Sequence, residues 1–281
     1  MDSLQEAIEK ARKEREGSIG QTAAPGEAGQ AAGASAEAEP SSRLTSSTSP
    51  AEAQAARIDY SATRQVDLNP ETLERNRVIA GDIHDSRVEA YRQLRSQILS
   101  DMKEHNWQTL AITSAHENAG KTLTAVNLAI CMSQEVSQTV MLVDLDLRTP
   151  HVHNTLGVDI DKGIVDHLQG DEDLGEIMFN PGYPRLVIVP GIPQGRFSSE
   201  ILSSPEMQTF LNDITGRYPN RIIIFDLPPL LRNDDALVFV PKADASLLVV
   251  EDGVTTPEDI ERCLQLMDKS QVLGTILNKA R

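Results

Sequence analysis

The segment SAHENAGKTLT at residues 114–124 is the part of the sequence that most constrains the fold. A short apolar run, Leu110 to Ile112, precedes it, and a helical pattern opens at Lys121. A glycine-containing loop between a strand and a helix can point backbone N–H groups at phosphate oxygens, as can the helix N-terminus. The segment therefore predicts a phosphate-binding loop, or P-loop.

Beyond this loop, short apolar runs alternate with amphipathic helical patterns. The runs are QTLAIT, TVMLVDLD, RLVIVP, RIIIFDLP, ASLLVVED and VLGTILN, and helical patterns begin near residues 86, 121, 204 and 256. Strands that alternate with helices indicate a mostly parallel sheet covered on both faces. We therefore expect the α/β class: a P-loop NTPase whose mostly parallel sheet is flanked by helices.

The N-terminal quarter of the chain has a different composition. Residues 1–16 place apolar side chains at helical spacing among charges, which predicts one amphipathic helix. Residues 17–57 are dominated by Ala, Gly, Ser, Glu, Gln and Pro, a composition that cannot offset the entropy of ordering. We expect an N-terminal helix at 1–16, a disordered low-complexity linker at 17–70 and a P-loop domain at 71–281.

Charge and composition exclude several classes of function. The net charge of −16 argues against nucleic acid as the main partner, because affinity for phosphate backbones comes from clustered Lys and Arg. No apolar run is long enough for a direct membrane span. Cys131 and Cys263 stand singly, so they predict neither disulfides nor a paired metal motif, and His151 and His153 are interpreted as loop residues. These features predict a cytoplasmic protein.

Carboxylates at the ends of two strands complete the predicted site. Asp144 and Asp146 end one strand and Asp226 ends another, and the carboxyl ends of parallel strands meet at one edge of a sheet. Lys121 is expected to contact the β and γ phosphates, and the Thr122 hydroxyl to bind Mg²⁺. We predict Asp226 as a water-mediated Mg²⁺ partner. Asp144 is predicted to contact the metal or to accept a proton from an attacking hydroxyl, with Asp146 nearby.

Together these motifs resemble the bacterial tyrosine kinases of exopolysaccharide and capsule assembly, a P-loop family. The matching segments are residues 115–122, Asp144-x-Asp146-x-Arg148 and Asp226-x-Pro228-Pro229, with Ala115 where the loop usually begins with Gly. The resemblance covers residues 89–279. It implies that residues 71–281 form an ATP-binding kinase-like domain that uses ATP and Mg²⁺ and transfers the γ-phosphate to tyrosine.

The resemblance and the residue chemistry together define the expected site. The expected catalytic residues are Lys121, Asp144, Asp146 and Asp226, and the expected metal ligands are Thr122, Asp144 and Asp226. The expected cofactor-binding residues are Ala115, Asn118, Ala119, Gly120, Lys121, Thr122, Leu123, Arg148 and Asn278. Arg148 is expected to balance the charge of Asp146 or to contact a phosphate, and Asn278 to contact adenine as in related ATPases.

The family resemblance also predicts partners. Glu89, Arg92 and Arg95 match an E-x-x-R-x-x-R motif that supports ring assembly in the family, so we expect a homo-oligomer. The helix at 1–16 is expected to bind a membrane-anchored polysaccharide chain-length regulator. Such a partner would recruit the protein to the inner face of the membrane.

Two alternatives to a kinase remain at this stage. Kinases of this family usually carry a C-terminal tyrosine cluster, whereas the last tyrosine here is Tyr218, and Tyr60 and Tyr91 are the candidate acceptors. A nucleotide-dependent assembly ATPase of the export machinery, without kinase activity, fits every motif. A Min- or Par-like switch ATPase fits less well, because it needs a second loop lysine where this chain has His116. We rank the kinase first, because the motif set of that family is matched more fully than that of either alternative.

Overall fold

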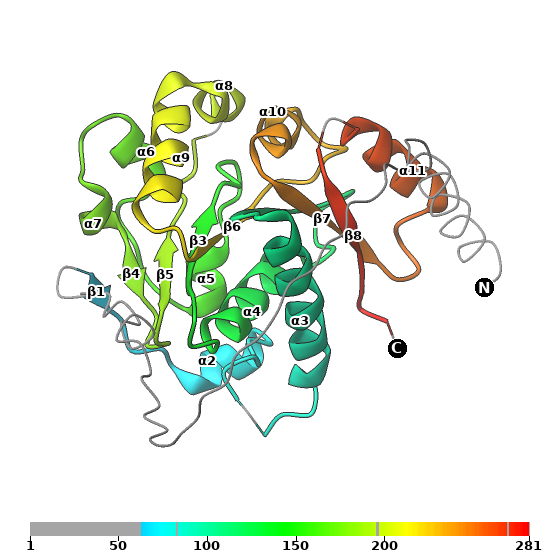
Figure 1. Cartoon of the computed structure of the whole chain (residues 1–281), viewed down its shortest axis with the longest axis horizontal. Coiled ribbons are helices and arrows are strands. Elements are labelled where there is room, and N and C mark those ends of the chain that lie inside the picture. The colour runs from blue at the N-terminus through cyan, green and yellow to red at the C-terminus, as the bar shows by residue number, and fades with distance from the viewer. Residues whose placement is uncertain (1–62, 83, 195–196, 269, 281) are drawn as a thin grey trace, which may run out of the picture. The chain divides into compact units, whose positions relative to one another are not determined.

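The computed structural model describes residues 63–82, 84–194, 197–268 and 270–280. In these residues eight strands form one sheet in the order β1-β4-β5-β3-β6-β2-β7-β8 (Figure 1). The strands are β1 Arg64–Gln65, β2 Thr109–Ser114, β3 Thr139–Asp144, β4 Phe179–Asn180, β5 Leu186–Val189, β6 Arg221–Asp226, β7 Ala245–Glu251 and β8 Val272–Asn278. Neighbouring strands are parallel except for the antiparallel pair β4 and β5.

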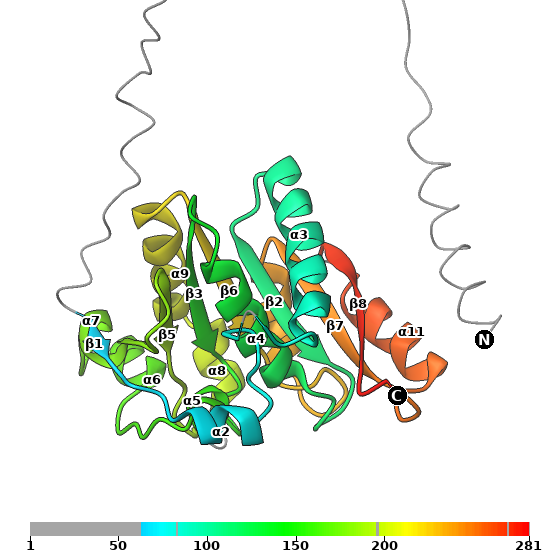
Figure 2. The ribbon, with the colours of Figure 1, turned by 90° about the horizontal axis from the view of Figure 1, so that it is seen from below.

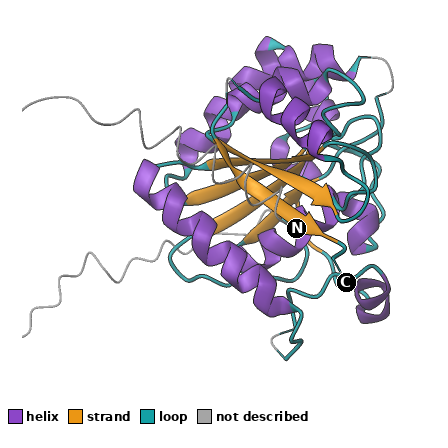
Figure 3. Cartoon of the chain, turned by 90° about the vertical axis from the view of Figure 1, so that its right-hand side faces the viewer, coloured by secondary structure: helices purple, strands orange, loops and turns teal. Residues whose placement is uncertain are grey.

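Helices cover both faces of the sheet (Figure 3). Buried apolar side chains form two clusters between these helices and the sheet. The helices that contribute to the first cluster are α2 Pro70–Arg75, α3 Val88–His105, α4 Lys121–Ser133 and α5 Val152–Leu156. Those of the second are α6 Ile164–Leu168, α7 Leu174–Ile177, α8 Ser198–Ser203, α9 Pro205–Arg217, α10 Asp235–Phe239 and α11 Pro257–Leu266, with a 3₁₀ turn at Val240–Lys242. Figure 2 shows α3 beside α4 on the first face.

The two apolar clusters explain why the central strands are apolar throughout. In β3, Val140 and Leu142 belong to the cluster with α4, whereas Met141 and Val143 belong to the cluster with α9. Successive side chains of a strand point to opposite faces, and both faces are covered here, so every position is buried.

Local sequence signals determine where the longer helices begin. The Ser204 hydroxyl accepts a hydrogen bond from Met207 N at 3.1 Å at the start of α9. At the start of α11, Thr256 and Asp259 form a reciprocal capping box. Both helices have proline in the first turn, where a missing N–H costs nothing. Within the described residues, no helix combines the length and apolar character needed to cross a bilayer.

The structure confirms the predicted fold class. The six predicted apolar strands correspond to β2, β3, β5, β6, β7 and β8, and the four helical patterns to α3, α4, α9 and α11. The two-residue strands β1 and β4 were not predicted. Because β1 joins the sheet, the folded part extends at least to Arg64, N-terminal of the expected boundary at residue 71. The predicted helix at 1–16 and residues 17–62 of the predicted linker lie outside the described residues.

The sheet order brings the motif-bearing strand ends together. Strand β6 lies between β2 and β3. Asp144, at the end of β3, is directly opposite Asp226, at the end of β6, while β2 leads into the P-loop from Ser114. Parallel strands bind ligands outside their carboxyl ends, so this edge is the expected location of the site.

Candidate active site

The P-loop connects β2 to α4 as the sequence predicts. Gly120 precedes α4 with φ of 94°, a left-handed conformation that favours glycine. A Cβ at this position would also collide with the Asn278 side chain. Asn278 Nδ2 donates to Ala119 O at 2.8 Å, so the end of β8 supports the backbone of the loop. Asn278 is therefore in the site, and its observed contact is with the protein backbone.

Four side chains form a connected cluster at the start of α4. Lys121 Nζ lies 2.7 Å from Asp146 Oδ2 and 3.9 Å from Asp226 Oδ1. The Thr122 hydroxyl donates to Asp226 Oδ2 at 2.6 Å. All four lie at the carboxyl edge of the sheet, which confirms that the predicted motifs converge in space.

The cluster and the neighbouring Asp144 contain more carboxyl groups than ammonium groups. Burial lowers the pKa of Lys121, but Asp226 and Asp146 outweigh this effect and the pKa ends above its usual value. Burial raises the pKa of Asp226 despite the nearby Lys121 ammonium. Burial, followed by repulsion from Asp226, raises the pKa of Asp144 to about 8. A cluster of this kind gains stability when it binds a further cation.

The oxygen atoms of the cluster fit Mg²⁺. Asp226 Oδ1 is buried and accepts no hydrogen bond, and the Thr122 hydroxyl lies beside the same carboxylate. Mg²⁺ prefers such oxygen ligands, and it usually takes only one or two carboxylates and completes its shell with water and phosphate. Accordingly, the described residues contain no group of three or more His, Cys, Asp or Glu that could hold a metal alone.

Backbone N–H groups surround the carboxylate of Asp144, the residue predicted to contact the metal or to accept a proton. Its Oδ2 accepts hydrogen bonds from His151 N and Val152 N, both at 2.9 Å, and its Oδ1 accepts from Asp146 N at 3.2 Å. The side chain is fully buried and is absent from the pocket lining. In this arrangement Asp144 holds the loop between β3 and α5, and Asp146 is the carboxylate that faces the pocket.

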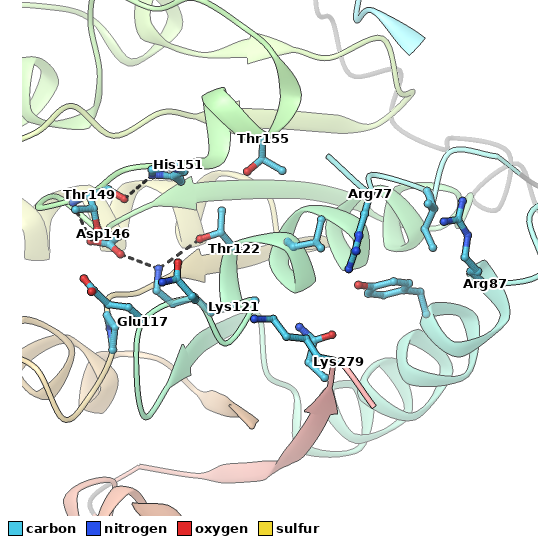
Figure 4. Close-up of a pocket in the computed structure, with 17 residues that line it drawn as sticks. Arg77, Arg87, Glu117, Lys121, Thr122, Asp146, Thr149, His151, Thr155 and Lys279 are labelled. Atoms are coloured by element: carbon cyan, nitrogen blue, oxygen red, sulfur yellow. Dashed lines mark hydrogen bonds and ion pairs between the residues drawn. The ribbon is translucent and has the colours of Figure 1, made fainter. Parts of the chain in front are cut away.

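A pocket of about 570 Å³ lies over this cluster (Figure 4). Of the predicted cofactor-binding residues, Asn118, Gly120, Lys121, Thr122, Leu123 and Asn278 line it. Ala115 and Ala119 are buried residues of the loop and do not line the pocket. Residues that the sequence did not single out as cofactor ligands also line it, namely Arg77, Ile79, Arg87, Tyr91, Glu117, Thr149, His151, Thr155, Pro229 and Lys279.

Arg148, predicted to balance Asp146 or to contact a phosphate, pairs with a different carboxylate in this structure. Its guanidinium donates Nε to Asp235 Oδ2 at 2.7 Å and Nη2 to Asp235 Oδ1 at 3.0 Å, while Ser198 Oγ donates to the same carboxylate at 2.7 Å. Asp235 is fully buried, and Arg148 does not line the pocket. Arg148 therefore connects the loop after β3 to α8 and α10, because it neutralises a buried carboxylate there.

The predicted oligomerisation motif divides into two parts. Glu89 and Arg92 pair with each other along α3 at 3.5 Å, and Glu89 is well exposed. Arg95 points toward the end of α4, where it donates to Cys131 O at 3.2 Å and pairs with Glu135 at 3.1 Å. Glu89 is thus exposed and pairs within α3, whereas Arg95 is bound to the end of α4 and to Glu135.

Two side-chain pairs hold the tip of the P-loop. His116 Nε2 lies 3.0 Å from Asp259 Oδ2 in the capping box of α11. Glu117 pairs with Arg232 in the segment before α10. His116, which occupies the position of the second lysine of switch ATPases, is therefore paired within its own chain.

Tyr91, a candidate phosphate acceptor, lies in the pocket wall. It is half-buried, its hydroxyl interacts with the side chains of Thr124 and Asn127, and burial raises its pKa. The Tyr91 hydroxyl is therefore held against α4 by these two contacts. The other candidate, Tyr60, lies outside the described residues.

Comparison with known proteins assigns the family. No protein-family model matches the chain. Tyrosine-protein kinase CpsD of Streptococcus agalactiae is 30% identical over 194 residues, which are 68% of this chain and 82% of CpsD. The chain belongs to the bacterial tyrosine-protein kinase family. Tyrosine-protein kinase YwqD of Bacillus subtilis is 29% identical over 208 residues, which are 73% of this chain and 86% of YwqD.

Longer family members and solved structures agree. The chain is 31% identical over 198 residues to tyrosine-protein kinase etk of Escherichia coli, of which it spans only 27%. The solved kinase domain of that protein has a TM-score of 0.66 and 28% identity, with 73% of this chain and 82% of the domain covered. MinD of Pyrococcus horikoshii, complexed with Mg-ADP, shares the fold at 22% identity and a TM-score of 0.50 over 60% of this chain and 69% of MinD.

Family membership decides between the alternatives. The predicted protein-tyrosine kinase of P-loop type, a nucleotide-binding transferase, is confirmed. The alternative of an assembly ATPase without kinase activity is not favoured, and the likeness to MinD extends to the fold alone.

Proposed function

We propose that the pocket binds ATP with Mg²⁺ and that the kinase transfers the γ-phosphate to a tyrosine hydroxyl. The observation that carries this proposal is the cluster of Lys121, Thr122, Asp146 and Asp226 at the base of one pocket. The Lys121 ammonium, the Asp226 oxygen without a hydrogen bond and the pocket-facing Asp146 carboxylate suit phosphoryl transfer. Catalysis of that reaction consists largely of positioning and charge stabilisation.

Each member of the cluster has a proposed role. Lys121 exchanges Asp146 for the β and γ phosphates, and Thr122 and Asp226 hold Mg²⁺. Bound Mg²⁺ would neutralise charge on the phosphate oxygens. Asp146 accepts the proton of the tyrosine hydroxyl, because it faces the pocket, and Asp144 positions Asp146 through its bond to the Asp146 backbone amide.

The experiment is transfer of labelled phosphate from ATP with Mg²⁺ by the full-length protein, followed by mapping of phosphotyrosine by mass spectrometry. Lys121→Met should abolish label, and Lys103→Met, which removes an exposed lysine of α3, should not. Asp146→Asn should lower the rate by about a hundredfold or more, and Asp144→Asn by less. Label that persists in Lys121→Met would contradict the proposal. A larger loss in Asp144→Asn than in Asp146→Asn would reverse the two roles.

We further propose that this kinase regulates the polymerisation and export of an exopolysaccharide or capsule. In this proposal residues 1–16 bind a membrane-anchored chain-length regulator, which recruits the kinase to the inner face of the membrane. The support is the amphipathic spacing of those residues and the family to which the chain belongs. Co-purification with the regulator should be lost when residues 1–16 are deleted. Unchanged co-purification would contradict this role.

A homo-oligomer completes the proposal. Glu89 and Arg92 on the outer side of α3 would form charge-assisted pairs with a neighbouring subunit, and Tyr60 is the preferred acceptor, since Tyr91 is held in the pocket wall. Loss of phosphotyrosine in Tyr60→Phe, with transfer to an added peptide intact, would support this assignment. Phosphate mapped to Tyr91 would contradict it.

A further inference from the structure

The pocket has two chemically different ends (Figure 4). Asp146, Thr149 and His151 lie at one end and Arg77 at the other, with Lys121 and Thr122 between them. Phosphates bind at the P-loop, and a tyrosine hydroxyl must approach the carboxylate end. The end that contains Arg77 is therefore left for the nucleoside.

Arg77 differs from the other cations near this end of the pocket. Arg87 pairs with Asp85 at 2.5 Å and Glu74 at 3.3 Å, and Lys279 pairs with Glu251 at 2.9 Å. Within the described part of the chain, no carboxylate lies at ion-pair distance from Arg77, and its side chain is exposed in the pocket. Its guanidinium is thus available to a ligand.

The backbone of Arg77 is held in an unfavourable conformation. Arg77 follows the C-terminus of α2 with φ of 59°, and its N–H donates to Glu74 O at 3.0 Å while Val78 N donates to Leu73 O at 2.8 Å. These two bonds define a Schellman motif, whose left-handed position is usually glycine because a Cβ is crowded there. An arginine at this position sacrifices stability, and such strain tends to occur where a side chain has a function.

Asn127 connects Arg77 to the P-loop helix. Its Oδ1 accepts from Ile79 N at 2.8 Å and Ala80 N at 3.0 Å, and its Nδ2 donates to Arg77 O at 3.1 Å and Leu123 O at 3.0 Å. Asn127 is fully buried in α4, just under two turns after Lys121. The helix that presents the phosphate-binding residues therefore also fixes the backbone of residues 77–80.

We propose that Arg77 binds the nucleoside and that Asn127 is the positioning residue that presents it. This proposal rests on the nucleotide site proposed above. The planar guanidinium of arginine stacks on aromatic rings, so Arg77 would lie against the base, with Tyr91 forming the adjacent wall. The contact between Arg77 and the nucleoside contributes equally to the bound substrate and to the transition state. It therefore lowers KM without changing kcat.

The test compares two probes, ADP and inorganic tripolyphosphate, each with Mg²⁺, by calorimetry on the full-length protein. Tripolyphosphate occupies the P-loop but has no nucleoside. Arg77→Ala should raise the Kd of ADP by about fivefold or more and leave that of tripolyphosphate within about twofold. In the kinase assay it should raise the KM for ATP with kcat unchanged. The matched control Arg75→Ala, an exposed arginine of α2 outside the pocket, should change neither affinity.

Two further variants separate binding from structure. Arg77→Gly relieves the left-handed strain, so the midpoint of thermal unfolding should hold or rise while ADP binding weakens as in Arg77→Ala. Asn127→Ala should weaken ADP binding more than tripolyphosphate binding. Combined with Arg77→Ala, it should add little further loss, because Asn127 acts through Arg77.

Three results would overturn the inference. The first is an ADP affinity that is unchanged in both Arg77→Ala and Arg77→Gly. The second is a loss of tripolyphosphate affinity equal to the loss of ADP affinity, which would make Arg77 a phosphate ligand. The third is fully additive losses in the double variant, which would remove the positioning role of Asn127. Failure of the wild-type protein to bind either probe would instead contradict the nucleotide site itself.

Discussion

Lys121 Nζ lies 2.7 Å from Asp146 Oδ2, so the ammonium that the P-loop would offer to phosphates is already paired with a carboxylate. Asp146 also accepts hydrogen bonds from the backbone and hydroxyl of Thr149 through Oδ1, which keeps the carboxylate in place. Binding of a nucleotide must therefore break one ion pair to make another. This exchange lowers the net gain from the lysine.

The first prediction follows from that competition. Asp146→Asn should tighten ADP binding in the absence of divalent cations by about fivefold, because Lys121 is released and a repulsive charge is removed. Calorimetry in the presence of a chelator measures the effect. Asp161→Asn, an exposed carboxylate away from the pocket lining, is the control. Unchanged or weaker ADP binding in Asp146→Asn would show that the ion pair between Lys121 and Asp146 does not reduce nucleotide affinity.

The second prediction concerns Arg148, which pairs with buried Asp235 and not with the pocket. Arg148→Ala should lower the free energy of unfolding by about 2 kcal/mol, because a buried carboxylate loses two donors. The Kd of ADP should stay within about twofold. Urea unfolding and calorimetry measure the two quantities, and Ser198→Ala, which removes the third donor, should show the same pattern with a smaller loss. A large loss of ADP affinity in Arg148→Ala would instead support the predicted role of Arg148 at the phosphates.

The third prediction separates the two parts of the E-x-x-R-x-x-R motif. Glu89→Lys should shift the protein to a smaller species in size-exclusion chromatography with light scattering, and stability should change by about 0.5 kcal/mol or less, as for exposed sites. Arg95→Ala should instead cost about 1 kcal/mol of stability, since it loses Glu135 and the Cys131 carbonyl. An unchanged oligomer in Glu89→Lys would exclude this side of α3 as the interface.

The fourth prediction is a dependence on alkaline pH. Burial raises the pKa of the Cys263 thiol to about 11, and Cys263 is fully buried. Because the folded state keeps this proton longer than the unfolded state, its contribution to stability is intact below pH 9 and is lost as the pH rises toward 11. Urea unfolding from pH 8 to pH 11 should show a decline that is smaller in Cys263→Ala. The folded protein at pH 8 should also resist alkylation at Cys263, and rapid labelling there would contradict the prediction.

Much of the fold was predictable because burial leaves a local record in the sequence. The central strands are covered on both faces, so β3 and β6 are continuous apolar runs, and α9 and α11 begin at Ser-Pro and Thr-Pro pairs. Strands β1 and β4 have two residues each, too few to show a period. Helices α5 to α8 and α10 are also short, and tertiary packing rather than local pattern determines them.

The residue types of the site were likewise predictable, but their orientations were not. The motif placed Asp144, Asp146 and Arg148 two residues apart, as in a strand, yet β3 ends at Asp144 and the following loop turns each side chain to a different partner. Asp144 binds the loop backbone, Asp146 binds Lys121, and Arg148 binds Asp235, which is 87 residues away.

Sequence by itself determined the P-loop, the parallel sheet and the family pattern, because strand burial, helix caps and loop chemistry depend on neighbours along the chain. Only the tertiary structure decided which carboxylate faces the pocket and brought Arg77 into it through Asn127, a contact across 50 residues. The physical reason is that a buried polar group must find a hydrogen-bond partner, and in this protein the partners come from distant segments that only the packed sheet brings together.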